Sequence, residues 1–428
     1  MMKKSRNKVL SIIFCAFITL WMIGTALSFC SYLGERTESI NRWKASTYYS
    51  FENNTAEQRV HVSIINRVQN KIEELLTEDN LLYSRLIRIN RWFNKFCYNY
   101  NMTTSLNGTV NNNRKSQDVV VRNETGQLTI FADDVNIESR VLAVSEFHQY
   151  LNSKGIKSIT IITPFKTGAI STDYFGVYKN FSSTKNDELV SGMRDNGVEV
   201  IDLTTQMTDM QEDALFFKSD HHWLPQSGLW ACSVLADWMN ENGYSIDESY
   251  FDLNSYSIEY ADNMFLGSLG RKVTDVYYST EPFPILIPEY ENEISVFNSK
   301  LNTTLSGTIQ NTMYDYSKLD YSDTLESNMY DFYSYGNQGL VEIHNLKNHD
   351  NNKILVIKES FANVMLPYMS NMSEYVSAID LRSFDGSLKK YIEQYDPDLV
   401  ITIYGISGYA DFEQFDNRSI VNSPFYFE

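Results

Sequence analysis

Cysteine is scarce in this chain, which has 4 cysteines among 428 residues. Cys15 and Cys30 lie in an apolar segment near the N-terminus, so only Cys97 and Cys232 remain for the rest of the chain. Two cysteines supply neither a disulfide framework nor a zinc site built on cysteine ligands. Both classes of protein are therefore excluded.

Positive charge is also in short supply. The chain has 36 Lys and Arg residues against 54 Asp and Glu residues, which gives a formal net charge of −18. Nucleic-acid binding requires clustered Lys and Arg side chains that neutralise phosphates, so we expect no nucleic-acid partner. Hydrophobic residues make up 43% of the chain, which is enough for a buried core and excludes a chain that is disordered throughout.

The N-terminus carries a basic cluster followed by a long apolar run. Four basic residues within positions 3–8 precede an uncharged run from Val9 to Gly34. Its most apolar part, Val9 to Cys30, is 22 residues long, and a helix needs about 20 apolar residues to cross the hydrocarbon core of a membrane. Because basic residues stay on the cytoplasmic side, we expect a single-pass anchor with everything after Glu35 outside the cell membrane.

Two alternatives concern processing of this segment. The small residues of Ala26-Leu27-Ser28 suit a signal peptidase, but the apolar run is longer than that of an ordinary signal peptide. Leu27 to Cys30 faintly resembles a lipoprotein site, yet Phe29 is too large beside the cysteine. The length of the run favours a retained anchor.

The anchor and the apolar patterns divide the chain into three parts. Residues 1–34 form the basic tip and the transmembrane anchor. Residues 35–116 form an extracytoplasmic helical segment and a linker, with apolar residues at helical spacing between Ala56 and Phe96. Residues 117–428 form the catalytic domain.

Within the third part, short apolar strands alternate with helices. We expect strands at 158–163, 198–202, 353–357, 376–379 and 399–403, helices at 139–151 and 229–239, and a hairpin that joins 119–121 to 128–131. This alternation predicts an α/β domain of three layers, in which helices cover both faces of a mostly parallel sheet.

The stretch from about 273 to 348 breaks that rhythm and is crowded with Tyr, Asp, Asn and Ser. We interpret it as an insertion on the catalytic domain. Its tyrosines, at 314–321 and 330–335, are candidates for stacking on sugar rings. The favoured alternative is that they cover an edge of the sheet.

Two short motifs carry candidate chemistry. Asp220 lies two residues before His222 in a loop between a strand and a helix, where a carboxylate can orient an imidazole. Ser360 lies where the buried strand 353–357 runs into a helix, and backbone N–H groups at a helix start can receive an oxyanion. Each motif alone is weak, because an Asp-x-His pair is usually incidental and a serine before a helix is usually an N-cap.

Three further residues are candidates for substrate binding. Arg382 follows the strand 376–379, and a salt bridge to Asp380 or Glu359 is an equal alternative. Tyr404 ends the last strand, and His221 neighbours His222. For Tyr404 an ordinary packed side chain is favoured, and for His221 a supporting position beside His222.

Taken together, these motifs resemble a known family. The residues that carry the resemblance are Asp220-His221-His222-Trp223 with Pro225 and Gly228, and the later Glu359-Ser360-Phe361-Ala362-Asn363. Further matching pieces are residues 161–166, 267–271, 379–382 and 396–400. Residues 117–405, without the Tyr-rich stretch, resemble the DHHW family of bacterial extracytoplasmic proteins. That family is related to the SGNH-hydrolase-like acetyltransferases that O-acetylate alginate and other exopolysaccharides.

The resemblance implies a Ser-His-Asp triad on an SGNH-hydrolase-like fold. Ser360 would be the nucleophile, His222 the base and Asp220 the orienting carboxylate, with no metal and no cofactor. The sequence departs from the family at Glu359, where the family usually has Asp.

The function implied is that of a serine O-acyltransferase, anchored in a bacterial cell membrane, that O-acetylates a cell-envelope or secreted polysaccharide through an acyl-serine. A multi-span membrane acyltransferase would supply the acyl donor. The same triad in a pocket that admits water would make a carbohydrate esterase. Further alternatives are a non-catalytic glycan-binding envelope protein and a metal-dependent phosphoesterase that uses residues 220–222, although no second cluster of ligands is evident for the latter.

Overall fold

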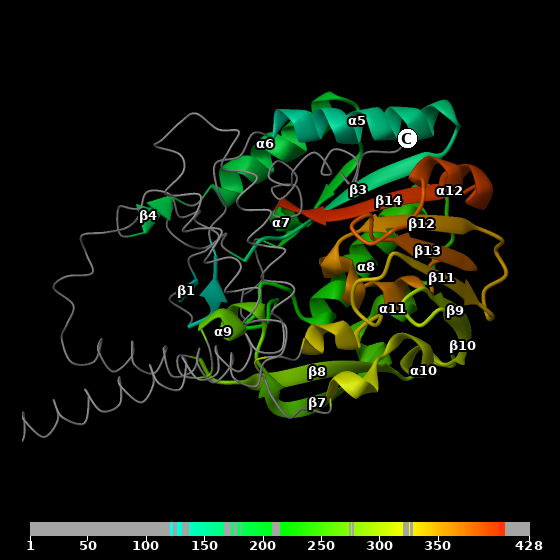
Figure 1. Cartoon of the computed structure of the whole chain (residues 1–428). Helices are drawn as coiled ribbons and strands as arrows, with labels where there is room; N and C mark the ends of the chain where they lie inside the picture. Colours follow the sequence, from blue (N-terminus) through cyan, green and yellow to red (C-terminus); the bar gives the residue numbers. More distant parts are fainter. Residues whose placement is uncertain are drawn as a thin grey trace, which may run out of the picture. The chain divides into compact units, whose positions relative to one another are not determined.

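The computed structural model describes residues 120–406, apart from 123–125, 131–136, 167–172, 175–177, 180, 208–214, 274, 276–277, 320–324 and 326–327 (Figure 1). The predicted anchor at Val9 to Cys30 and the helical block from Ala56 to Phe96 lie outside the described residues. Among the residues that are described, no helix combines the length and the apolar character needed to span a membrane.

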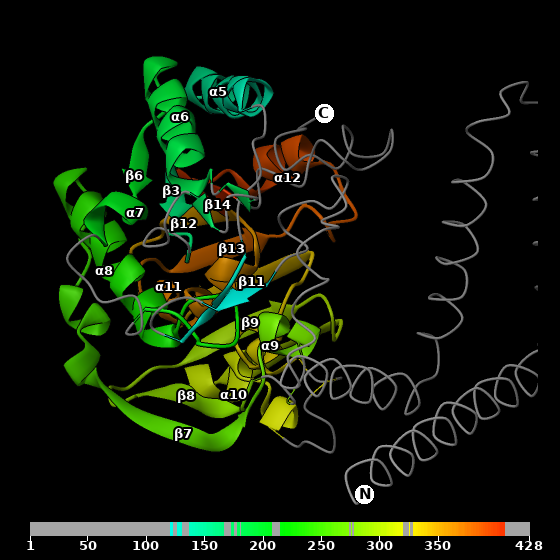
Figure 2. The ribbon, with the colours of Figure 1, turned by 90° about the vertical axis from the view of Figure 1, so that its left-hand side faces the viewer.

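A sheet of eight strands forms the centre of the described domain (Figures 1 and 2). Its strands are β3 (Lys157–Thr163), β6 (Val200–Asp202), β9 (Ile294–Asn298), β10 (Thr303–Gly307), β11 (Leu340–Asn345), β12 (Lys353–Lys358), β13 (Tyr375–Ile379) and β14 (Leu399–Gly405), in the order β10-β9-β11-β13-β12-β14-β3-β6. From β13 to β6 all neighbours are parallel, whereas β9, β10 and β11 pair antiparallel. The predicted α/β architecture with a mostly parallel sheet is confirmed.

The remaining elements surround this sheet. The helices are α5 (Glu138–Ser153), α6 (Ser182–Asp195), α7 (Leu203–Gln206), α8 (Pro225–Glu241), α9 (Ser268–Val273), α10 (Ile309–Met313), α11 (Leu366–Met369) and α12 (Leu388–Tyr395). The 3-10 helices are η4 (Glu248–Phe251), η5 (Leu253–Ser255), η6 (Tyr316–Leu319), η7 (Met329–Phe332) and η8 (Ser360–Val364). Three antiparallel pairs join β1 (Val121–Arg122) to β2 (Leu128–Thr129), β4 (Asp173–Tyr174) to β5 (Tyr178–Lys179), and β7 (Tyr256–Phe265) to β8 (Glu281–Pro288).

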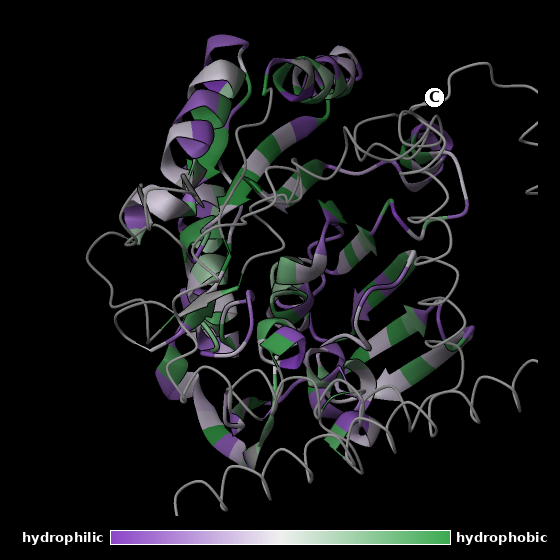
Figure 3. Cartoon of the chain, turned by 60° about the vertical axis from the view of Figure 1, so that its left-hand side comes forward, coloured by the Kyte–Doolittle hydropathy of each residue, from purple (hydrophilic) through white to green (hydrophobic). Residues whose placement is uncertain are grey.

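Both faces of the sheet are buried along its parallel strands, as their uninterrupted apolar runs predict. Along β12, Ile354 and Val356 join the core cluster that contains residues of α8 and α11. Leu355 and Ile357 point the other way, into the cluster with residues of α5, α6 and α12. The parallel strands are therefore continuous hydrophobic runs, because successive side chains enter two different cores. Figure 3 shows hydrophobic (green) segments along the strands of the sheet.

This topology also places the candidate site. The parallel strands β12 and β13 end on the same edge of the sheet, so the residues that follow them, from Glu359 and from Asp380, lie side by side. In parallel α/β sheets the carboxyl edge is where loops gather functional side chains.

The structure corrects the interpretation of residues 273–348 as an insertion. β9 and β11 of this stretch pair with one another, and β11 pairs with β13, so they continue the central sheet. The sequence hides them because β10 has no buried face, with exposed or half-buried residues throughout, and β9 and β11 each have only alternate buried positions. Such short half-buried strands lack the continuous apolar run of the parallel ones.

Three of the described tyrosines of this stretch are core residues. Tyr314, Tyr330 and Tyr333 are each at most 2% exposed, so they do not offer their faces to a sugar. The Tyr333 hydroxyl donates to the carbonyl of Pro284 at 2.9 Å and accepts from the N–H of Leu286 at 3.3 Å. Among the described residues of this stretch, Tyr316 is the exposed tyrosine, at 48%.

We therefore predict that Tyr333→Phe lowers the free energy of unfolding by about 1–3 kcal/mol, because it leaves a buried N–H and a buried carbonyl without this hydrogen-bond partner. Urea unfolding measures the change, and Tyr316→Phe is the matched control, expected to stay within about 0.5 kcal/mol of the parent. Equal stability of the two variants would mean that the buried hydroxyl contributes nothing.

Candidate active site

Ser360 lies at the point where β12 turns into η8. β12 ends at Lys358, Glu359 keeps an extended backbone, and η8 starts at Ser360. A helix start leaves backbone N–H groups without intrahelical acceptors, and Ser360 is the first residue of η8. The strand-to-helix junction predicted from the sequence is present.

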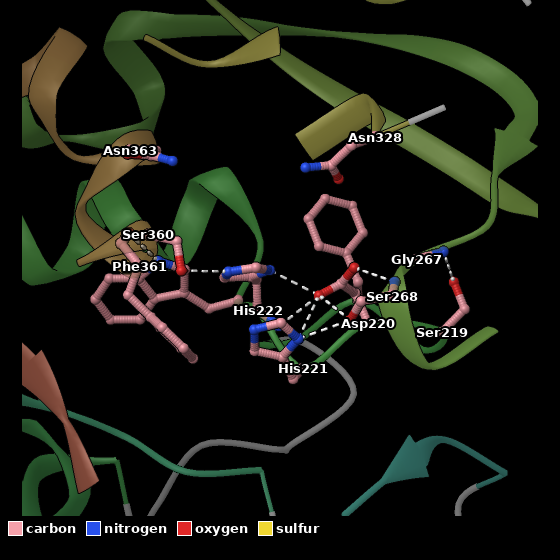
Figure 4. Close-up of polar contacts among 12 residues, drawn as sticks. Ser219, Asp220, His221, His222, Gly267, Ser268, Asn328, Ser360, Phe361 and Asn363 are labelled. Atoms are coloured by element: carbon pink, nitrogen blue, oxygen red, sulfur yellow. Dashed lines mark hydrogen bonds and ion pairs between the residues drawn. The ribbon is translucent and has the colours of Figure 1, made fainter. Parts of the chain in front are cut away.

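Asp220, His222 and Ser360 form one hydrogen-bonded row (Figure 4). The His222 Nδ1 and Asp220 Oδ1 atoms are 2.7 Å apart, and the His222 Nε2 and Ser360 Oγ atoms are 2.8 Å apart. A carboxylate only accepts hydrogen bonds, so we assign the imidazole proton to Nδ1. Nε2 is then the acceptor for the Ser360 hydroxyl, which is the arrangement a general base requires.

The Asp220 carboxylate is buried but well supplied with donors. Oδ1 accepts from the backbone N–H of His222 at 2.9 Å, and Oδ2 accepts from the backbone N–H of Ser268 at 2.6 Å. Burial by itself raises the pKa of this carboxyl group, but the two neighbouring histidines and the Ser268 N–H outweigh it and hold the pKa well below its usual range. The group is therefore an anion at neutral pH.

Gly267 is a glycine because Asp220 lies against it. A Cβ atom at Gly267 would be 2.4 Å from the Asp220 Cβ and 2.6 Å from Oδ2. The N–H of Gly267 also donates to the Ser219 hydroxyl at 2.9 Å. The start of α9 thus approaches the carboxylate closely enough for the N–H of Ser268 to bind it.

Two buried or half-buried charges hold the loop that carries Asp220 and His222. The Lys166 ammonium is buried and donates to three carbonyl groups of the loop, those of Phe217, Lys218 and Asp220. The Glu281 carboxylate accepts hydrogen bonds from two N–H groups of the same loop, those of Lys218 at 2.9 Å and Ser219 at 2.7 Å. A cation on the carbonyls and an anion on the N–H groups fix one loop conformation.

Aromatic contacts fix the imidazole and join the two motifs. The His222 ring lies between Tyr330, stacked at a centroid distance of 3.9 Å, and His221, tilted at 3.8 Å. Trp223 is fully buried, and its indole N–H donates to the Phe361 carbonyl in η8 at 2.9 Å. The residue after the histidine therefore holds the helix that begins with the serine.

The three predicted substrate-binding residues have different surroundings. Arg382 pairs with Asp380 through contacts of 2.6 and 2.9 Å, the alternative weighed from the sequence, and its side chain is 45% exposed. Tyr404 is 3% exposed and packs in the core cluster of α5, α6 and α12, away from solvent. His221 is half-buried, with its Nδ1 2.7 Å from the Ser268 hydroxyl, and burial and the neighbouring His222 lower its pKa to about 3.

Glu359 and Lys358 add buried charge beside the serine. The Glu359 carboxylate accepts from the backbone N–H of Gly405 at 2.5 Å, which joins the ends of β12 and β14. The Lys358 ammonium donates to the Asn363 side chain at 2.5 Å, and burial lowers the pKa of Lys358 to about 8. Glu359, where the sequence departs from the family pattern, thus links the ends of two neighbouring strands beside the serine.

Residues 220–222 are also the one group in the described part of the chain whose donor atoms could hold a metal ion, lying within 4.8 Å of one another. Both ring nitrogens of His222 already face partners, Asp220 on one side and Ser360 on the other. A metal would have to displace at least one of these hydrogen bonds, so the donor set fits a proton-transfer row better than a metal centre.

Several residues that hold the site together were not predicted from the sequence. Lys166 and Gly267 lie within segments that matched the family resemblance, but neither had a role attached to it. Glu281 and Tyr330 carried no signal, because they reach the site from the stretch interpreted as an insertion.

Comparison with known proteins agrees with the fold and the motifs. Residues 125–257 match the family model for the SGNH hydrolase-like domain of the acetyltransferase AlgX. That segment contains Asp220 and His222 and ends before Ser360. The resemblance to SGNH hydrolase-like acetyltransferases predicted from the sequence is confirmed.

Solved structures show the same fold at low identity. A DHHW family protein from Eubacterium siraeum is 15% identical with a TM-score of 0.56, covering 72% of this chain and 96% of that one. Bacillus cereus PatB1 is 16% identical with a TM-score of 0.56, covering 72% of this chain and 99% of that one. A search of curated proteins gives no match.

Proposed function

We propose that this protein is a serine O-acyltransferase that moves an acetyl group onto a hydroxyl of a cell-envelope or secreted polysaccharide. The observation that carries the proposal is the row of hydrogen bonds from Asp220 through His222 to Ser360, at 2.7 and 2.8 Å. The match of residues 125–257 to an acetyltransferase domain supports the choice of acyl group.

In the first half-reaction, the Ser360 Oγ attacks the carbonyl carbon of the donor ester while His222 Nε2 takes the hydroxyl proton. Asp220 stabilises the imidazolium that forms. The backbone N–H groups at the start of η8 are the proposed donors to the oxyanion. When the donor's C–O bond breaks, His222 returns the proton to the leaving oxygen, which leaves an acetyl-serine.

The second half-reaction reverses these roles on the acceptor. His222 Nε2 accepts the proton of a sugar hydroxyl as that oxygen attacks the acetyl carbonyl, and the proton then returns to Ser360. Water in place of the sugar gives a carbohydrate esterase with the same residues, which stays the alternative. The outcome depends on whether the acceptor excludes water from the acyl-serine.

Location and partners belong to the same proposal. The apolar run from Val9 to Cys30 would anchor the chain in a bacterial cell membrane with the catalytic domain outside. A donor made in the cytoplasm must then cross that membrane, so a multi-span acyltransferase is the proposed source of acetyl groups.

The mechanism predicts a burst of leaving group when p-nitrophenyl acetate is added, because the acyl-enzyme forms before it is resolved. Ser360→Ala should abolish the burst, and His222→Ala should slow acylation by on the order of 10⁴-fold. Asp220→Ala should slow acylation roughly ten- to a hundredfold less than His222→Ala does, because the base is still present, although it is less well oriented. Stopped-flow absorbance measures all three.

The control is Ser233→Ala, which removes a hydroxyl that only donates to the Trp230 carbonyl of its own helix. It should leave the burst unchanged. A full burst in Ser360→Ala refutes the acyl-serine, and loss of activity on adding a chelator would instead favour the metal-dependent alternative.

The stacking on His222 makes Tyr330 a positioning residue. We predict that Tyr330→Leu lowers kcat/KM for the same ester by roughly ten- to a hundredfold and distorts its pH profile, because the imidazole gains freedom to rotate. Tyr330→Phe keeps the ring and should retain activity within about threefold.

The matched control is Phe332→Leu, a fully buried aromatic on the same 3-10 helix that contacts other rings than His222. It should lose stability like Tyr330→Leu but keep the pH profile of the parent. Identical pH profiles for both leucine variants would mean that Tyr330 contributes to core packing and does not position His222.

The anchor predicts that protease added to intact protoplasts digests the domain from residue 117 onward. Western blotting against this domain follows the digestion, with a cytoplasmic protein as the control for sealed membranes. Complete protection of the domain in sealed protoplasts would contradict the proposed orientation.

A further inference from the structure

The turn before β11 has an unusual backbone. Ser334, Tyr335 and Gly336 have φ values of 55°, 57° and 73°, so three successive residues adopt the left-handed conformation. For residues other than glycine this conformation costs about 1–2 kcal/mol each. Strain of this kind persists only where surrounding contacts impose it, and it gathers at binding and catalytic sites.

The surrounding contacts join this turn to the helix that carries the nucleophile. The Ser334 hydroxyl donates to the carbonyl of Asn363 in η8 at 2.8 Å, and its N–H donates to the Met313 carbonyl at 2.7 Å. A Cβ atom at Gly336 would lie 2.4 Å from the Asp331 carboxylate, so only glycine fits there. The turn is therefore clamped in place.

The strained turn presents Asn337 at the surface. Its Oδ1 accepts from the Asn363 amide at 3.0 Å, and Asn363 in turn accepts from the Lys358 ammonium at 2.5 Å. Within the described part of the chain, the Asn337 amide nitrogen has no recorded partner, and the residue is exposed. An oriented amide that still has donors to offer is what polar ligand recognition uses.

A cavity of about 460 Å³ opens beside this amide. Its lining includes Ser299, Lys300, Asn337, Ser383, Phe384 and Asp385. These residues follow β9, precede β11 and follow β13, so the cavity lies on the sheet edge where β12 delivers Ser360. Strands are spaced about 4.8 Å apart, which puts the cavity roughly 5–15 Å from the serine along that edge.

The cavity is built by close packing. A Cβ atom at Gly339 would lie 2.4 Å from the Ser383 carbonyl oxygen. The segment before β11 and the segment after β13 are therefore in direct contact, and any side chain at position 339 would push them apart. Phe384 is half-buried and packs its ring edge-on against Tyr391 at a centroid distance of 5.9 Å.

The chemistry of this lining suits an uncharged polyhydroxylated ring. Amide and hydroxyl groups can both donate and accept hydrogen bonds, and Phe384 offers an aromatic surface for C–H groups. One cation, Lys300, and one anion, Asp385, line the cavity, so it favours neither an anionic nor a cationic ligand.

We propose that this cavity is an acceptor subsite, which binds a neutral sugar ring adjoining the one whose hydroxyl is acylated at Ser360. The inference rests on the proposed transferase function. It adds that the acceptor is uncharged and that it binds in this cavity. The strained turn couples the two sites, because Ser334 within it bonds to η8 and Asn337, directly after it, lines the cavity.

Sugar binding tests the subsite separately from catalysis. Cellotetraose and chitotetraose serve as neutral probes and tetragalacturonate as the anionic one, with affinities measured by isothermal titration calorimetry on the full chain. We expect a neutral probe to bind more tightly than the anionic probe. Asn337→Ala and Phe384→Ala should each weaken the neutral probe about tenfold, and Phe384→Ala should leave the burst with p-nitrophenyl acetate as in the parent.

The matched control is Gln310→Ala, which removes an amide from a second cavity at the opposite edge of the sheet, lined also by Thr308 and Lys347. It should leave binding unchanged. The subsite is refuted if neither neutral probe binds at millimolar concentration, if tetragalacturonate binds more tightly, or if the two cavity variants bind as the parent does. Absence of the burst from the parent would refute the acyl-serine while leaving the binding result intact.

Discussion

The rest of the site depends on keeping an ionised carboxylate in the interior. Asp220 is 1% exposed, and a buried anion is tolerated only when its oxygens are fully supplied with donors. His222 supplies two of those donors and Ser268 another, which places the imidazole and the start of α9 around one group. Gly267 must be a glycine for the same reason. One electrostatic requirement thus sets the tautomer of the proposed base and the shape of the loop.

The second constraint is the register between two motifs that lie 138 residues apart along the chain. The parallel sheet delivers Ser360 to the carboxyl edge, and Trp223 holds η8 directly through the Phe361 carbonyl. A loop fixed by Lys166 and Glu281 completes the alignment. The atoms of the proposed proton transfer are therefore aligned before a substrate binds, and such preorganisation is a main source of rate enhancement in enzymes.

Much of this could be predicted from the sequence, and the reasons differ between elements. The five parallel strands were predictable because both of their faces are buried, which leaves continuous apolar runs such as residues 353–357. Asp220, His222 and Ser360 were candidates because a short spacing and a strand-to-helix junction are local signals, and the family resemblance implied that they form one triad. β9, β10 and β11 were missed because strands buried on one face, or on neither, lack such runs. Tyr330 and Glu281 were missed because a residue's contact with a distant loop has no local pattern.

The measurement that tests the central claim most directly is the location of the acyl group on the protein. The full chain is incubated with an activated acetyl ester, quenched in acid during the burst, digested, and analysed by tandem mass spectrometry. The account predicts one acetyl group on the Ser360 side chain, absent from Ser360→Ala and retained in Ser233→Ala. An acetyl group that forms during turnover on any other residue, or turnover with no acetyl-enzyme trapped at all, would contradict it.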